Sequence, residues 1–344
     1  MNFSSPAVGD EHKSKTCFRF IETTPGGKAL RSKDLLAPGS PFLFARVDVW
    51  YNEVMVNKKK SKKDDKNNIK LMLAAVVLVA AAVLCGIIVA RNNSKPAADY
   101  IVETNAFFAP FEFYEGQEIK GVDVEIVDRV AEKLGKEIEI RNVDFDVIID
   151  NVAAGKIADA GAAGLTITPA REEKVNFSIP YYTSVQYVIY EKDAAPEVRD
   201  GYVVWDALAG KTIGSQTGST GYMFADGEVD SGVLAGTNTV VKGFDSHQLA
   251  ADAIGAHMID YAIADELPAK MIVEKNPGLA ALPLYYVGEG TQADYPAEES
   301  YAIAVNKEKT ELLEAFNEVL AEMLTEDANG ETEIDQLVLK YMGF

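Results

Sequence analysis

The segment Gly164–Arg171 constrains this chain more than any other, because it sets a strand end, a helix start and one arginine in order. Thr168 is a suitable N-cap residue, and Pro169 fits the first helical position, where a missing N–H costs nothing. Arg171 then falls in the first helical turn, where the helix dipole disfavours a cation. A guanidinium there is useful when an anion meets it, because its planar fork matches a carboxylate and the helix start adds free N–H groups. The segment therefore predicts a carboxylate-binding corner.

Charge is divided unevenly along the 344 residues. Residues 1–97 carry 16 Lys and Arg against 8 Asp and Glu, a net charge of +8, and the remaining 247 residues carry 17 against 45, a net charge of −28. An acidic domain of that size repels phosphate backbones, so we expect no nucleic-acid partner. A chain of this length has room for two medium lobes and an additional segment.

Cysteine and histidine usage limits the chemistry available to the acidic part. Cys17 and Cys85 both precede it, so it folds without disulfides and has neither a cysteine nucleophile nor a thiolate metal site. The histidines His12, His247 and His257 are scattered, a spacing that does not favour a metal site. We therefore expect no metal and no cofactor.

An uncharged apolar run, residues 71–90, follows a basic flank, residues 55–70. Seven lysines lie between Lys58 and Lys70, and a basic flank before an apolar core is typical of membrane targeting. The run is long enough to span a bilayer and longer than most cleaved signal cores. The lysine excess places the N-terminus inside the cell. We expect a transmembrane or signal segment that tethers the acidic domain to the cell membrane, outside the cytoplasm, at the cell surface or in the periplasm.

Three details of the N-terminal part stay open at this stage. The apolar segment is either cleaved or retained. Cys85 invites a lipid anchor, but Leu84 occupies the position where a small residue is expected, so an ordinary membrane-buried cysteine is the simpler interpretation. Residues 1–54 are either a short cytoplasmic extension or an over-extended reading frame, since Met55 is a natural start. Residues 91–98 form a short linker.

From Tyr100 onward the pattern alternates short strands with helices, as in an α/β domain. Residues 122–134 carry apolar side chains at helical spacing, and Gly135 ends the predicted helix. The other predicted elements that matter here are strands at 158–164, 261–265 and 301–305, and helices at about 268–276, 308–324 and 332–342.

The corner is part of a pattern that continues through Val175–Tyr182 and resembles the signature of the family 3 extracellular solute-binding proteins, the amino-acid receptors of ABC importers. The resemblance starts near Asp99 and runs to the C-terminus. Other stretches that carry it are Asn105–Phe111, Gly121–Ile126, Val143–Asp146, Gly218–Thr220, Ala264–Glu266 and Tyr301–Val305. Each stretch is weak alone, and their shared order and spacing make the match.

The resemblance implies an α/β, two-lobed type II periplasmic-binding-protein fold, here preceded by the N-terminal membrane or signal segment. Lobe 1 would be discontinuous, with residues 99–187 plus 288–344, and lobe 2 would be the insert 188–287. The ligand would lie in the cleft between the lobes. Closure about a hinge is a common switching mode in such proteins.

The resemblance also implies an α-amino acid ligand, whose carboxylate needs a cation and whose ammonium needs carboxylates and carbonyls. Arg171 matches the family's carboxylate-binding arginine, and Thr166 matches a position that contacts the carboxylate through its backbone and hydroxyl. Gly164 matches a position whose carbonyl accepts from the ammonium, or it allows close packing. Asp265 follows a buried strand and matches the ammonium-binding aspartate, and it can also cap the next helix.

The other matched positions would shape the cleft. The turn Gly218–Thr220 presents N–H groups at a helix start and matches the segment that closes on the carboxylate. Phe108 and Phe145 match aromatic positions that sandwich the ligand side chain, unless they belong to the core. Asn105 replaces an aspartate of several members, which favours a neutral ligand side chain over a lysine or arginine. The predicted ligand-binding residues are Asn105, Phe108, Phe145, Gly164, Thr166, Arg171, Gly218, Ser219, Thr220 and Asp265.

Three functions compete. The first is a receptor that delivers an amino acid to an ABC transporter permease. A sensory ectodomain would require a signalling domain, and residues 1–70 are too short and lysine-rich for a kinase. A dehydratase on the same scaffold would require a general acid or base in the cleft. The matched cleft residues include no histidine or cysteine, so we expect a receptor rather than an enzyme.

Overall fold

The computed structural model describes three parts of the chain, residues 75–77, 98–288 and 290–343. The chain divides into two units, residues 1–95 and 96–344. Four clusters of buried apolar side chains form the cores of the second unit, and all of their members belong to it. The segment 96–344 therefore carries its own cores and folds by itself.

Most of the predicted N-terminal features lie outside the described residues. This holds for the extension 1–54 and the basic flank 55–70. It also holds for the apolar segment 71–90, except for residues 75–77, and for residues 91–97 of the linker. Those three residues are helical and exposed. In the parts of the chain that the structure describes, no helix combines the length and the apolar content that crossing a bilayer requires.

Lobe 1 is built on a five-stranded sheet with the order β5-β1-β6-β16-β7. β1 is parallel to β5 and β6, and β16 is antiparallel to β6 and β7. The strands of this sheet are β1 (Tyr100–Thr104), β5 (Ile138–Asn142), β6 (Ala160–Gly161), β7 (Asn176–Phe177) and β16 (Ala304–Val305). A second, antiparallel sheet of the same lobe contains β2 (Phe107–Phe108), β3 (Glu112–Glu115) and β4 (Glu118–Lys120).

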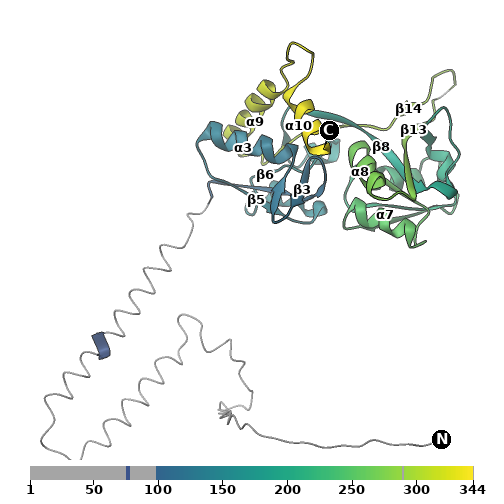
Figure 1. Cartoon of the computed structure of the whole chain (residues 1–344), viewed down its shortest axis with the longest axis horizontal. Helices are drawn as coiled ribbons and strands as arrows, with labels where there is room; N and C mark the ends of the chain where they lie inside the picture. Colours follow the sequence, from purple (N-terminus) through teal and green to yellow (C-terminus); the bar gives the residue numbers. More distant parts are fainter. Residues whose placement is uncertain (1–74, 78–97, 289, 344) are drawn as a thin grey trace, which may run out of the picture. The chain divides into compact units, whose positions relative to one another are not determined.

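Helices cover both faces of the larger sheet (Figure 1). On one face lie α3 (Val122–Leu134), α9 (Thr310–Met323) and α10 (Glu333–Met342), and on the other lies α4 (Ile148–Ala154), which follows the 3-10 turn η3 (Phe145–Val147). The lobe also contains the short helix α5 (Pro169–Glu172). Because successive strand side chains point to opposite faces, Val102 of β1 joins the cluster under α3, α9 and α10, while Ile101 packs on the cluster of α4. The predicted helix 122–134 is confirmed, and Gly135 ends it with a φ of 61°.

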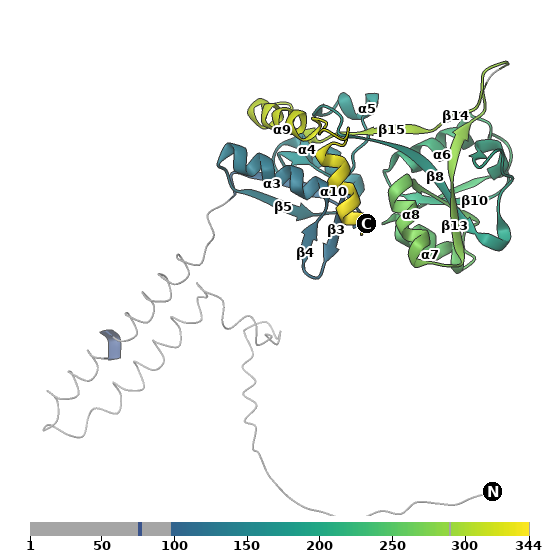
Figure 2. The same ribbon diagram turned by 45° about the horizontal axis from the view of Figure 1, so that its top comes forward.

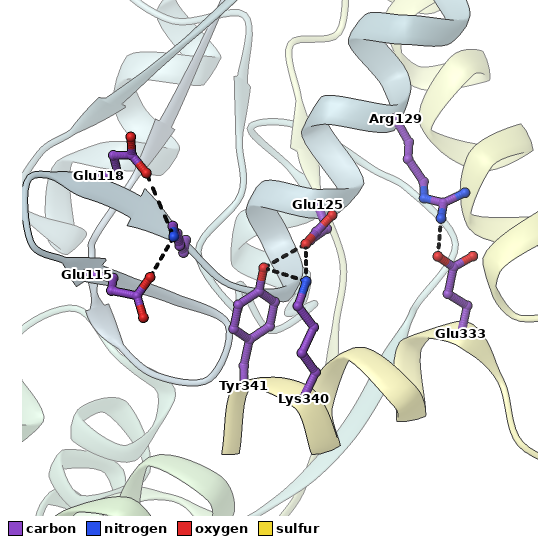
Figure 3. Close-up of polar contacts among 8 residues, drawn as sticks. Glu115, Glu118, Glu125, Arg129, Glu333, Lys340 and Tyr341 are labelled. Atoms are coloured by element: carbon purple, nitrogen blue, oxygen red, sulfur yellow. Dashed lines mark hydrogen bonds and ion pairs between the residues drawn. The ribbon is translucent and has the colours of Figure 1, made fainter. Parts of the chain in front are cut away.

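Polar contacts fasten the last helix to α3 (Figure 3). Lys340 Nζ lies 2.7 Å from Glu125 Oε1, and the Tyr341 hydroxyl donates to the same oxygen at 2.6 Å. These two donors hold the pKa of Glu125 below its ordinary value. Arg129, one turn after Glu125 on α3, forms an ion pair with Glu333 at the start of α10. The apolar side of α10, which is buried beneath these contacts, consists of Ile334, Leu337 and Val338.

Lobe 2 contains an eight-stranded sheet whose main order is β11-β10-β12-β8-β13-β14. Its strands are β8 (Tyr182–Glu191), β9 (Val203–Val204), β10 (Thr212–Gln216), β11 (Val240–Phe244), β12 (Tyr261–Asp265), β13 (Leu279–Tyr286), β14 (Tyr295–Pro296) and β15 (Glu298–Tyr301). Its helices are α6 (Thr220–Asp230), α7 (His247–Gly255) and α8 (Glu266–Lys275), with 3-10 turns η4 (Lys192–Ala194) and η5 (Trp205–Leu208). Val188 of β8 packs with Trp205 on one face, and Ile189 packs against α7 and α8 on the other.

Two antiparallel strands, β8 and β15, connect the lobes (Figure 2). The first part of β8 pairs with β15, from Tyr182 opposite Tyr301 to Val185 opposite Glu298. The later part of β8 pairs with β12 and β13 inside lobe 2. The prediction of one strand at 301–305 was wrong, because β15 ends at Tyr301 and β16 begins at Ala304. Between them the N–H of Ala302 donates to the Leu165 carbonyl, so the chain leaves the connection and joins the sheet of lobe 1.

Candidate functional site

The predicted corner at Arg171 has the expected local structure. Thr168 is the N-cap of α5, its hydroxyl accepts from the Arg171 N–H at 3.3 Å, and Pro169 is the first helical residue. The Arg171 side chain is buried, and burial lowers the pKa of its guanidinium, an effect that Glu299 and Asp265 oppose. The ring of Phe145 lies 5.7 Å from the guanidinium carbon, within the range of a cation–π contact.

Arg171 joins the two lobes through backbone carbonyls. Its Nη1 donates to the Thr166 carbonyl at 2.7 Å, and its Nη2 donates to the Gly218 carbonyl of lobe 2 at 3.0 Å. A guanidinium has five N–H donors, so three are left for a ligand carboxylate. Close by, the hydroxyls of Thr166 and Thr220 lie 3.3 Å apart across the lobes. The structure therefore brings together four of the residues predicted to bind the carboxylate.

The turn before α6 presents its backbone at this place. Ser219 is the N-cap of α6, and its hydroxyl accepts from the Tyr222 N–H at 3.1 Å. Gly218 has a φ of +79°, in the left-handed region that favours glycine. A Cβ at Gly218 would lie 2.9 Å from the Cβ of Asp146, which belongs to η3 of lobe 1. The two lobes are therefore closed on each other at this turn.

Asp265 ends the buried strand β12 and is itself buried. Its Oδ1 accepts from Gln186 Nε2 at 2.5 Å, and its Oδ2 accepts from the Tyr301 hydroxyl. Asp265 occupies the N-cap position of α8, but among the described residues its side chain makes no capping hydrogen bond. The predicted additional role as a helix cap was therefore wrong, because the connecting strands take up both carboxylate oxygens.

A pair of neutral amides closes another part of the cleft. Asn105 lies just after β1, and its Nδ2 donates to the Val143 carbonyl at 2.7 Å. Gln216, at the end of β10, donates from Nε2 to Asn105 Oδ1 at 2.9 Å and to the Asp245 carbonyl at 3.1 Å. Both amides are buried. An aspartate at position 105 would have no donor for the Val143 carbonyl, so the local bonding fits an amide.

The two predicted aromatic residues occupy different surroundings. Phe145 is partly buried below Arg171, at the edge of the cluster under α4. Phe108 belongs to the main core of lobe 1, packs against Phe111 and Tyr301, and meets the ring of His247 at 5.6 Å between centroids. Phe108 is thus both a core residue and a contact with lobe 2.

Gly164 has a close-packing role. Its φ is +53°, and a Cβ there would come within 2.5 Å of the Phe108 ring. Its N–H donates to Asp123 Oδ2 at 3.0 Å, and Asp123 also accepts from the Tyr181 hydroxyl at 2.6 Å. Burial raises the pKa of Asp123 to about 6 despite these donors. A larger residue at 164 would displace the Phe108 ring.

Sequence reasoning missed Glu299, a buried carboxyl group at the centre of the site. Its Oε2 accepts from the Thr166 hydroxyl at 3.0 Å. Burial and the nearby charge of Asp265 raise the pKa of Glu299 well above its ordinary value. Glu299 lies two residues before Tyr301, so the two side chains point to the same face of β15. This spacing could have predicted Glu299 as a site residue only if β15 had been recognised as a connection between the lobes.

His247 was also not among the predicted site residues, although it lies close to Phe108 and Asp265. It is the first residue of α7, is buried, and lies with Nδ1 3.3 Å from the Ile263 carbonyl. Burial lowers its pKa, although Asp265 acts in the opposite direction, so the ring is held neutral against Phe108. The N-cap Ser246 before it is the sequence signal that predicts its position at a helix start.

A separate hollow of about 250 Å³ lies between β2–β3 of lobe 1 and α7–α8 of lobe 2. Its lining residues are Ala106, Phe107, Ala109, Phe113, Tyr114, Gln248, Pro268, Met271, Ile272 and Lys275. None of the predicted ligand-binding residues lines it. The groups that could recognise a zwitterion are instead those that meet where the lobes close, namely one guanidinium, the start of α6 and two carboxyl groups.

Comparison with known proteins identifies what the chain resembles. The family model described as bacterial extracellular solute-binding proteins, family 3, matches residues 100–344. The arginine-binding extracellular protein ArtP of Bacillus subtilis is 30% identical over 235 residues, which cover 68% of this chain and 82% of that protein. Such relatives are binding proteins rather than enzymes, in agreement with the function inferred from sequence.

Solved structures agree with this result. An ancestral arginine-binding protein bound to arginine is 30% identical with a TM-score of 0.58, and covers 71% of this chain and 98% of its own. The structure described as an ancestral arginine-binding protein bound to glutamine is 31% identical with a TM-score of 0.57 and the same coverage. The two-lobed periplasmic-binding-protein fold inferred from sequence is confirmed. The chain belongs to the bacterial extracellular solute-binding proteins, family 3.

Proposed function

We propose that this protein is an extracytoplasmic receptor that binds one α-amino acid between its lobes and delivers it to an ABC transporter permease. The observation that carries the proposal is the opposition of Arg171 to Asp265 at the place where the lobes meet. Arg171 belongs to α5 of lobe 1, and Asp265 ends β12 of lobe 2. An α-amino acid carries a carboxylate for the first and an ammonium for the second, so its binding links the lobes.

The residues of lobe 2 complete the carboxylate site. The turn Gly218–Thr220 adds N–H groups at the start of α6, where the helix dipole favours an anion. Thr166 offers its hydroxyl from the opposite lobe. In this proposal the parts of the segment before β8 and after β15 move as one rigid body, the part between these strands moves as the other, and β8 and β15 are the hinge.

The ligand side chain is neutral in our proposal. The support is the bonding of Asn105, which donates to the Val143 carbonyl and accepts from Gln216, so that neutral amides line this part of the site. Phe108 and Phe145 add apolar ring surface. The related ancestral protein has been described with glutamine bound, and glutamine is a ligand of this chemistry.

A cationic side chain is the second candidate. Several relatives are named as arginine-binding proteins, among them ArtP of Bacillus subtilis. The site also contains a carboxyl group, Glu299, in addition to the one that an ammonium requires. A guanidinium or a lysine ammonium would find a partner there if Glu299 were ionised.

A thermal-shift screen of the segment 96–344 against the common amino acids tests the proposal. A ligand at 100 times its Kd stabilises a protein by about 2.7 kcal/mol, which raises the Tm of a domain of this size by roughly 5–11 °C. We expect the largest shifts from neutral amino acids such as glutamine, without turnover of the ligand. Hits limited to arginine and lysine would favour the second candidate, and a screen without hits would refute the proposed function.

We further propose that residues 71–90 tether the receptor to the membrane, with the acidic domain outside the cytoplasm. The support is the uncharged apolar run behind the lysine-rich residues 55–70. Fractionation of cells that express the full chain should find the protein with the membranes. Protease added to intact cells should remove the acidic domain. In cells with an outer membrane, that membrane is permeabilised first. Full-length protein in the soluble cytoplasmic fraction would contradict the tether without affecting the binding proposal.

A further inference from the structure

The carboxyl group of Glu299 is placed as a ligand-binding group rather than as a structural one. β15 points Glu299 and Tyr301 to the same face, and the Tyr301 hydroxyl donates to Asp265. Glu299 is only 3% exposed. One of its oxygens accepts from the Thr166 hydroxyl, while Oε1 has no hydrogen-bond partner in the described part of the chain. A buried carboxyl oxygen without a donor costs free energy until something supplies one.

The charges around Glu299 show what kind of donor is missing. Arg171 faces it, but the guanidinium bonds to the carbonyls of Thr166 and Gly218 and not to a carboxylate. The site therefore holds two carboxyl groups for one guanidinium, whose hydrogen bonds in this structure go to carbonyl groups. The titratable and charged groups that act on Glu299 or on its neighbour Asp265 are Glu112 of β3, Arg171 of α5, His247 of α7, Asp265 of β12, Tyr286 of β13 and Tyr301 of β15. An ammonium group has the charge and the three donors that this set lacks.

We propose that Glu299 is a second carboxylate for the α-ammonium group of the ligand, acting together with Asp265. This inference rests on the proposed function, because it names a further residue of the same site. Glu299 would make the receptor selective for ligands with a free amino group. An α-carboxylic acid of the same shape, without the amine, would leave two buried carboxyl groups facing each other.

The proposal has a consequence for protons. Burial and Asp265 raise the pKa of Glu299, so in the ligand-free closed site the two carboxyl groups are not both charged. An ammonium between them favours the charged form of both. Glu299 then releases its proton to the solvent when the ligand binds. Because the bound state holds fewer protons, affinity should rise with pH, by up to about tenfold per pH unit while Glu299 of the free protein is protonated.

The experiment is calorimetric titration of the segment 96–344 with L-glutamine or L-arginine, whichever binds more tightly, at about neutral pH. Two buffers of different ionisation enthalpy give the number of protons released. For the wild type we expect a net release of protons, and for Glu299→Gln we expect a smaller release and affinity at least about tenfold weaker, a loss of about 1.4 kcal/mol. The glutamine side chain still accepts from Thr166, so the hydrogen bond is kept while the charge is removed.

Two controls separate binding from structure. Glu103→Gln makes the same change at a buried carboxyl group that bonds to Asn151 of α4, and it should bind like the wild type. The deamino analogue of the ligand, 4-carbamoylbutanoate or 5-guanidinopentanoate, should bind Glu299→Gln no more weakly than it binds the wild type.

The outcomes are distinct. If neither amino acid binds the wild type, the proposed function falls and this inference falls with it. If the wild type binds but Glu299→Gln has the same affinity within about threefold, or if the wild type releases no proton, Glu299 is not an ammonium ligand while the receptor function stands. Should the variant fail to fold, the proton count of the wild type decides alone.

Discussion

Replacing Gly218 by alanine should block closure of the lobes without disturbing either lobe. An ideal Cβ at this position lies 2.9 Å from Asp146 Cβ and 3.0 Å from Asp146 Cα, across the interface. Carbon atoms prefer a separation of about 3.5–4.0 Å, so the lobes would have to part locally by roughly 0.5–1 Å. That shift lengthens the 3.0 Å bond from Arg171 to the Gly218 carbonyl beyond hydrogen-bonding distance.

The magnitude follows from this bond. A hydrogen bond to a charged group contributes about 1.5–3 kcal/mol, so Gly218→Ala should bind the ligand roughly 10- to 150-fold more weakly. The φ of +79° adds a strain of about 1–2 kcal/mol for alanine. That strain is present in the open and the closed state alike, so it lowers the free energy of unfolding and not the affinity.

A matched variant separates the two effects. Gly236 has a φ of +73°, and a Cβ there meets no heavy atom within 4 Å among the described residues. Gly236→Ala should therefore lose stability to a similar degree and bind the ligand normally. Calorimetry gives the Kd of both variants, and thermal unfolding gives their stability. If Gly218→Ala binds within about threefold of Gly236→Ala, the ligand-bound lobes do not close with Gly218 against Asp146, and the reasoning is refuted.

Two further predictions concern buried charges. Arg171→Ala should weaken ligand binding by about 30- to several-thousand-fold in a calorimetric titration, because truncating one member of a buried charge pair typically costs about 2–5 kcal/mol. Arg171→Lys should restore little of this affinity, since an ammonium lacks the planar fork of the guanidinium. Normal binding by either variant would show that Arg171 is not part of the site. Glu112 is fully buried with no hydrogen-bond partner among the described residues, and burial, with Asp123 beside it, raises its pKa well above the ordinary 4.5. The native state thus keeps the Glu112 proton at pH values where the unfolded state has lost it, so Glu112 makes the stability of the protein fall as pH rises. Glu112→Gln should therefore raise the Tm relative to the wild type at about pH 8 and change it little at about pH 4. An equal change of Tm at both pH values would contradict the raised pKa of Glu112.

Local rules were enough for the elements that depend on local signals. The helix that ends at Gly135 and the Thr168–Pro169 start of α5 depend on neighbours in sequence, and both have the structure that their residues predict. The start of α6 at Ser219 is of the same kind. These rules predicted where Arg171 lies along its helix, because capping and the left-handed glycine are properties of a few consecutive residues.

The parts that sequence could not predict depend on contacts between distant segments. Residues 301–305 were predicted to form one strand, but the chain changes partner there from β8 to β6 and β7, and nothing local marks such a change. Glu299 and His247 were passed over for the same reason. A charged or polar residue in a strand or at a helix start usually faces solvent, and contacts with segments distant in sequence bury these two.

The central claim is that one amino acid is held between Arg171 and Asp265 by both lobes. The crystal structure of the segment 96–344 with the amino acid that binds most tightly tests it most directly. We predict a ligand carboxylate within about 2.7–2.9 Å of the Arg171 guanidinium, with its ammonium at the carboxylates of Asp265 and lobe 2 closed over it. A ligand bound to one lobe alone, or seated in the hollow lined by Phe107 and Met271, would contradict the account.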